Sequence, residues 1–153
     1  MGDEGVGSVL AERLASDPRL PEDVEVIEGG TDLLACADRM IGRTRVTLLD
    51  AILDPTETGA VRVFEDDFSS LETHQPGAHA LSVVASLQLL RIAEPGLREV
   101  RFKLITVAID SASLSTSLSP ALTAEVPRLL DRTLLEIRDN VPYGTDGGRA
   151  GVA

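Results

Sequence analysis

Residues 46–52 read VTLLDAI and decide the fold of this chain. Apolar residues fill successive positions here, so a strand over this stretch is apolar on both faces. Such a strand is typical of a sheet that helices cover on both sides. Two further runs, residues 61–64 (VRVF) and residues 100–109 (VRFKLITVAI), also predict strands.

The segments around these strands alternate between strand and helix patterns. A short β-branched run at residues 24–27 predicts another strand. Ser119 followed by Pro120 is a typical helix start, with a capping side chain and then proline in the first turn. Expected helices cover residues 5–16, 32–41, 77–91 and 120–138. This rhythm predicts an α/β protein.

Length and composition limit the domain organisation and the partners. The 153 residues suit one domain, expected over residues 1–140, with a glycine-rich disordered tail over residues 141–153. A net charge of −11 disfavours binding to nucleic acid or anionic membranes. The single cysteine excludes an internal disulfide. With neither a membrane-length apolar run nor a signal peptide, we expect a cytoplasmic protein.

Few residues offer catalytic chemistry, because common nucleophile, phosphate-loop and zinc-protease motifs are absent from the sequence. Cys36 falls in an expected helix among apolar neighbours, which favours a buried core thiol over a nucleophile. His74 and His79 lie five apart, so on a helix they point about 140° away from each other and share no metal-binding face. His74, at an expected helix start, either binds a metal or bonds nearby backbone.

Acidic residues give the stronger indication of a site. Asp50 is expected to end the apolar strand at residues 46–50 (VTLLD), and ligands gather at the carboxyl ends of strands in open α/β sheets. Its alternative role is that of a cap or turn residue. Asp3 and Glu4 precede a helix, where the helix dipole alone favours acids. Together Glu4, Asp50 and His74 would offer two oxygens and one nitrogen to a divalent metal such as nickel or zinc.

Four short motifs resemble those of the hydrogenase maturation proteases, in the same order and over residues 1–139. Residues 2–7 (GDEGVG) resemble the family's acidic D-[DE]-G-[VI]-G segment, and residues 28–31 (EGGT) resemble its D-G-G-T turn with Glu in place of Asp. Residues 49–51 (LDA) match its strand-ending D-A, and residues 74–77 (HQPG) match its H-Q-x-G.

This resemblance implies a three-layer α/β/α sandwich with a twisted, mostly parallel sheet. It also implies an endopeptidase that removes the C-terminal extension of a nickel-iron hydrogenase large-subunit precursor after nickel insertion. Glu4, Asp50 and His74 would be the catalytic and metal-binding residues. The metal would be nickel, expected to be that of the substrate, or another divalent ion. The expected partner is the precursor, and the expected state is a monomer.

The chain departs from the family pattern at two places. Pro76 stands where the family has an apolar residue. Proline is tolerated in the first turn of a helix, so we expect little effect on the fold. Family members begin with an apolar strand and a G-x-G-N turn, whereas Met1 directly precedes the acidic segment here. We therefore expect a sheet without the family's first strand, and either a start codon upstream or a degenerate copy. An inactive, chaperone-like binding relative and a metal-dependent hydrolase of another substrate stay open as alternatives.

Overall fold

The computed structural model describes residues 2–30, 32–66, 68, 83–111 and 117–139. Its elements follow in the order η1 (Gly2–Gly5), α1 (Val6–Ala15), η2 (Leu34–Cys36), α2 (Ala37–Met40), β1 (Arg45–Leu53), β2 (Val61–Glu65), α3 (Val83–Ala93), η4 (Pro95–Leu97), β3 (Arg101–Ile109) and α4 (Pro120–Arg138).

The described strands form one sheet in the order β1-β3-β2, with β3 in the centre. β1 runs parallel to β3, as expected for this fold class, whereas β2 runs antiparallel to it. The sheet is therefore mixed. The three strands predicted from residues 46–52, 61–64 and 100–109 are all present.

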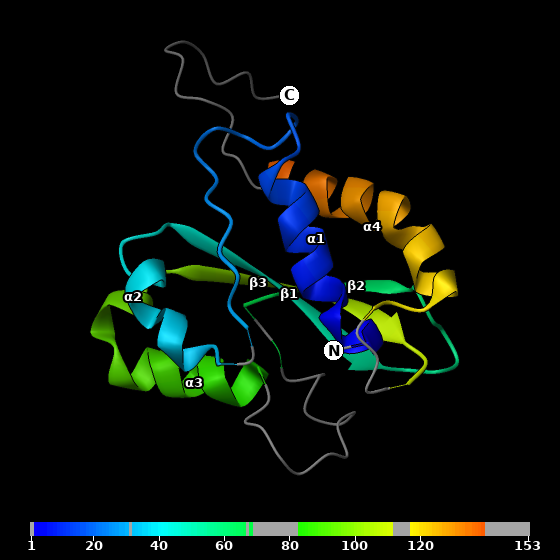
Figure 1. Cartoon of the computed structure of the whole chain (residues 1–153). Coiled ribbons are helices and arrows are strands. Elements are labelled where there is room, and N and C mark those ends of the chain that lie inside the picture. Colours follow the sequence, from blue (N-terminus) through cyan, green and yellow to red (C-terminus); the bar gives the residue numbers. More distant parts are fainter. Residues whose placement is uncertain (1, 31, 67, 69–82, 112–116, 140–153) are drawn as a thin grey trace, which may run out of the picture.

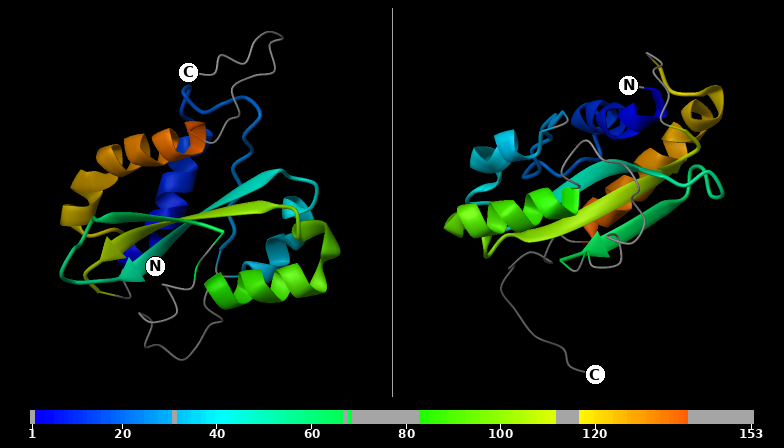
Figure 2. Two further views of the ribbon diagram at one scale, coloured as in Figure 1. Left: turned by 180° about the vertical axis from the view of Figure 1, so that it is seen from behind. Right: turned by 90° about the horizontal axis from the view of Figure 1, so that it is seen from below.

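Helices cover both faces of the sheet, which confirms the α/β class and the layered arrangement (Figures 1 and 2). α1 and α4 pack on one face through an apolar cluster that includes Leu10 and Leu129. α2 and α3 pack on the other face, around Phe102. β1 contributes side chains to both clusters, as the apolar residues on both of its faces predicted.

α1 lies very close to the backbone of β1. A Cβ atom at Gly7 would stand 2.7 Å from the carbonyl oxygen of Leu49. This distance is too short for any side chain, so glycine at this position allows the helix to approach the strand. The contact brings the start of α1 beside the carboxyl-terminal half of β1.

One of the elements expected from the sequence is wrong in this structure, and a second is confirmed only in part. Residues 24–27 were expected to form a strand, but they pair with no described strand. A β-branched run becomes a strand only when a neighbour completes its hydrogen bonds, and β1 does not pair with it. The helix expected over residues 32–41 is two short turns, η2 and α2, joined at Cys36.

Cys36 is half-buried rather than fully buried. Its thiol lies 3.9 Å from the carbonyl oxygens of Gly29 and Asp32, at the edge of the cluster around Phe102.

The helix predicted from Ser119 and Pro120 is present, and its cap is formed as expected. The hydroxyl of Ser119 accepts a hydrogen bond from the backbone N–H of Leu122, over 3.3 Å. No helix within the described ranges is long and apolar enough to cross a membrane. The expected disordered tail lies outside the described residues, as do His74, His79 and Pro76.

Candidate functional site

The structure places two of the three predicted site residues. Glu4 lies in η1 with its side chain exposed. Asp50 is half-buried and lies within β1, which continues to Leu53, so the prediction that Asp50 ends the strand is wrong. His74 lies outside the described residues. No group of three His, Cys, Asp or Glu side chains suited to a metal occurs within the part of the chain that the structure describes. The convergence of Glu4, Asp50 and His74 therefore stays a prediction.

Asp50 is a carboxylate in a poorly solvated position. Burial raises its pKa above the ordinary value, and a hydrogen bond of 2.9 Å from the backbone N–H of Ala51 to Oδ1 partly opposes this rise. Among the described residues, no cationic side chain forms an ion pair with it. A half-buried carboxylate without a cation is costly unless a proton or a metal neutralises it.

Asp50 belongs to a row of polar residues that crosses the sheet. In the strand register, Thr106 of β3 lies opposite Asp50 of β1, and Arg62 of β2 lies opposite Thr106. Residues in register point to the same face of a sheet. The row therefore carries a carboxylate, a hydroxyl and a guanidinium on the face that α2 and α3 cover.

Arg62 forms ion pairs with two carboxylates of the loop that joins β1 to β2. Its Nη2 atom donates to Oδ2 of Asp54 over 2.7 Å and to Oε2 of Glu57 over 2.8 Å. The bonds to Glu57 and Asp54 raise the pKa of Arg62, and hydrogen bonds from Thr56 and Arg62 lower the pKa of Asp54. The guanidinium is thus held by the loop rather than by Asp50.

Thr106 is the unusual member of the row. Its side chain is 3% exposed, and its Oγ1 atom has no hydrogen-bond partner among the described residues. A buried hydroxyl without a partner costs roughly 1–3 kcal/mol, and such exceptions call for an explanation. In the sequence, Thr106 is marked only as a polar residue within the apolar run at residues 100–109. Threonine is also common in ordinary strands, so this position alone did not indicate a functional site.

The segment that carries Glu4 is held in place from two sides. Asp3, the residue before it, accepts a hydrogen bond from the backbone N–H of Ser119 over 2.6 Å. Gly7 abuts the carbonyl of Leu49, the residue before Asp50. η1 also contacts β1 directly. These contacts place the Glu4 segment beside β1 on the face of the sheet that α1 covers, whereas the side chain of Asp50 lies on the other face, with Leu48 and Ile52.

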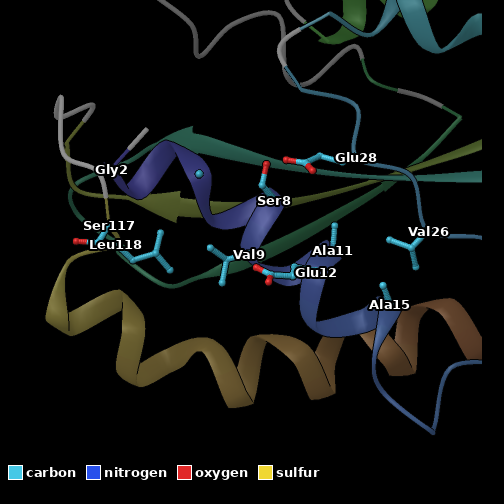
Figure 3. A pocket seen from close by; sticks show the side chains of 11 residues that line it. Gly2, Ser8, Val9, Ala11, Glu12, Ala15, Val26, Glu28, Ser117 and Leu118 are labelled. Carbon is cyan, nitrogen blue, oxygen red and sulfur yellow. The ribbon is translucent and has the colours of Figure 1, made fainter.

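A hollow of about 400 Å³ opens beside α1 (Figure 3). Ser8 and Glu12 line it from the helix, Val26 and Glu28 from the facing segment, and Leu118 from the approach to α4. Neither Glu4 nor Asp50 is among its lining residues, although Gly2 and Gly5 on either side of Glu4 are. The hollow therefore borders the predicted site without containing it.

Comparison with known proteins settles the family. A sequence model described as "hydrogenase maturation protease" matches residues 9–136. The chain belongs to the hydrogenase maturation protease family. The matched range includes Asp50, Thr106 and His74, and it begins after Glu4.

Two known proteins are similar to this chain over most of its length. The hydrogenase 2 maturation protease of Escherichia coli is 26% identical over 140 residues, which span 90% of this chain and 84% of that protein. Protein FrxA of Pyrococcus furiosus is 29% identical over 141 residues, which span 91% of this chain and 98% of that protein.

Solved structures support the same fold. The [NiFe] hydrogenase maturation protease HybD from Thermococcus kodakarensis superposes with a TM-score of 0.73 at 25% identity, covering 90% of this chain and 91% of that one. The hydrogenase maturating endopeptidase HybD from E. coli has a TM-score of 0.74 at 24% identity, covering 92% of this chain and 87% of that one. At such identities the second likeness concerns the fold alone.

Proposed function

We propose that this protease removes the C-terminal extension from the large-subunit precursor of a nickel-iron hydrogenase, after nickel has been inserted. Family membership supports the hydrolysis of a protein during hydrogenase maturation. The single observation in the structure that supports the site is Asp50. It is a half-buried carboxylate without a described cationic partner, in the second half of a strand that runs parallel to its neighbour.

The chemistry of the site suits a divalent cation supplied by the substrate. Glu4 and Asp50 offer oxygen ligands, and His74 would add an imidazole nitrogen; such a mixed set fits nickel or a similar divalent ion. When bound, the metal would polarise a carbonyl or a water molecule. A precursor without nickel would lack this contact, which explains how processing would wait for nickel insertion.

The protein's own residues would mainly position the precursor. η1 fixes Glu4 through the Asp3–Ser119 bond, and the packing of α1 on β1 keeps η1 beside the strand of Asp50. Because the charge of Asp50 is poorly solvated, a cation from the precursor would relieve its desolvation cost. Hydrolysis with a metal that polarises the carbonyl or a water molecule would require no nucleophilic serine or cysteine.

A processing assay with purified precursor tests this proposal. Glu4→Gln, Asp50→Asn and His74→Ala should each abolish removal of the tail from a nickel-loaded precursor. The matched controls His79→Ala and Glu99→Gln should process it at the normal rate. Glu99 is exposed and precedes the amino-terminal end of β3. Asp50 lies towards the carboxyl-terminal end of the parallel strand β1, so the two residues lie towards opposite ends of these strands.

The assay also separates this proposal from its alternatives. Cleavage of nickel-free precursor at the same rate would contradict the metal-dependent recognition. Binding of the precursor without any cleavage by the unaltered protein would favour a binding-only relative.

A further inference from the structure

Thr106 stands where a hydrophobic residue would be expected. The row before it on this face of the sheet is Leu48, Leu104 and Phe64, and the row after it pairs Ile52 with Ala108. All of these side chains are apolar and contribute to, or pack against, the core cluster around Phe102. A valine at position 106 would match the shape of threonine and would continue this apolar surface.

The described residues offer the buried hydroxyl of Thr106 no hydrogen bond in this structure. Oγ1 is buried, and it has no hydrogen-bond partner in the described part of the chain. Arg62, its neighbour on β2, is bound to Asp54 and Glu57. The polar neighbour that is left in the row is Asp50.

Asp50 has capacity to accept this hydroxyl. Among the described residues its carboxylate accepts a hydrogen bond from the backbone N–H of Ala51, at Oδ1. A carboxylate has about four acceptor positions, and a threonine hydroxyl is free to rotate. Adjacent strands lie about 4.8 Å apart, so side chains in register reach each other without any movement of the backbone.

We propose that Thr106 is a positioning residue, whose hydroxyl donates to the Asp50 carboxylate when the nickel-loaded precursor is bound. The inference rests on the proposed function and adds a residue to it. A metal bound to one carboxylate oxygen of Asp50 leaves the other oxygen free to accept a hydrogen bond. Thr106 is the buried hydroxyl donor next to it in the strand register. Partners of this kind commonly change metal affinity or activity by about 10–100-fold when they are removed.

Thr106→Val is the decisive variant, and Thr133→Val is its matched control. Thr133 is also buried, at 1% exposed, but its hydroxyl donates to the carbonyl oxygen of Leu129 over 2.8 Å. We expect Thr106→Val to melt at the same or a higher temperature than the unaltered protein, while it trims the nickel-loaded precursor at least about tenfold more slowly. Thr106→Ser should restore most of the rate, and Thr133→Val should trim normally.

A double variant shows whether Thr106 acts through Asp50. Ni²⁺ binding to the purified protein, followed by calorimetry, should weaken at least about tenfold in Thr106→Val. Asp50→Ala with Thr106→Val should bind Ni²⁺ no more weakly than Asp50→Ala alone, because coupled residues are not additive.

Normal trimming by Thr106→Val would overturn the proposal. So would a loss of trimming that is accompanied by a lower melting temperature and is shared by Thr133→Val, because it would indicate a structural role. If the unaltered protein trims no precursor, the proposed function fails, and Ni²⁺ binding decides the inference. Weaker binding by Thr106→Val then supports it, and equal or absent binding in both proteins overturns it.

Discussion

The carboxylate of Asp3 lies 2.6 Å from the backbone nitrogen of Ser119, which donates a hydrogen bond to it. The two residues are 116 positions apart in the sequence. Asp3 is 5% exposed, so this charged group is buried against the start of α4. One hydrogen bond thus ties the segment that carries Glu4 to the helix whose first turn Ser119 caps.

Asp3→Ala should destabilise the protein by about 1.5–3 kcal/mol, because it leaves the partly buried N–H of Ser119 without its charged acceptor. Asp3→Asn should cost less, since an amide oxygen also accepts. Urea unfolding followed by circular dichroism measures both effects. Asp23→Ala, which removes an exposed carboxylate, serves as the control. Equal unfolding midpoints for Asp3→Ala and Asp23→Ala would show that the Asp3–Ser119 bond adds nothing.

Gly7→Ala should weaken the fold near the site. The added methyl group would meet the Leu49 carbonyl oxygen at 2.7 Å, and backbone on both sides must move apart. Overpacking of this kind costs about 1–3 kcal/mol, against a gain of up to about 1 kcal/mol from better helix propensity. The expected net result is a lower melting temperature and slower processing.

Gly29→Ala is the matched control for Gly7→Ala. Its methyl group would lie 3.6 Å from the sulfur of Cys36, which is an ordinary contact. The melting temperature of this control should be unchanged. A Gly7→Ala protein that melts with the control would contradict the close packing of α1 on β1.

Asp50→Asn should separate stability from function. The amide keeps the shape of the side chain and removes the negative charge. Burial disfavours that charge, because it raises the pKa of the Asp50 carboxyl group. At neutral pH the variant should therefore be as stable as the unaltered protein, or more stable, while precursor processing is lost. Unfolding curves and the processing assay on the same preparations measure this pair of effects. A marked loss of stability would mean that Asp50 serves the fold.

The pairing of Asp17 with Arg19 predicts a pH dependence at the end of α1. The guanidinium and the backbone N–H of Arg19 both donate to this carboxylate, and they lower the pKa of Asp17 to about 2. A lowered pKa means that the folded state favours the charged form. The stability from this pair is therefore complete above the unfolded pKa, near 3.9, and disappears as the pH falls towards 2.

Asp17→Asn provides the comparison. The difference in unfolding free energy between the unaltered protein and this variant should be constant from neutral pH down to about pH 4, and should then shrink. Denaturant titrations across that range measure it. A difference that stays the same at pH 2 would contradict the assignment.

Local signals in the sequence predicted those elements that depend on few other parts of the chain. The apolar run at residues 100–109 was sufficient to identify β3. Ser119 and Pro120 identified the start of α4, because a cap and a first-turn proline act within one turn of the helix. The alternation of strand and helix patterns predicted the α/β class, and the family resemblance implied helices on both faces of the sheet; the fold confirms both.

Relationships across the chain were beyond such signals. Residues 24–27 have the composition of a strand, but strand formation needs a partner, and periodicity does not reveal whether one is present. Nor does it reveal that β2 runs antiparallel to β3. The Asp3–Ser119 bond and the Asp50–Thr106 register depend on the finished fold. The role of Glu4, Asp50 and His74 stays a prediction from motifs.

The central place of β3 has a consequence for how the chain folds during its synthesis. β1 and β2 do not pair with each other, and each waits for β3, which begins almost fifty residues after β1 ends. At about 5–20 residues per second, the ribosome takes several seconds to supply the missing strand. Throughout that interval the backbone edge of β1 lacks β3, its partner among the described strands. The nascent chain is then open to wrong pairing and to chaperone binding, well before the folded protease exists.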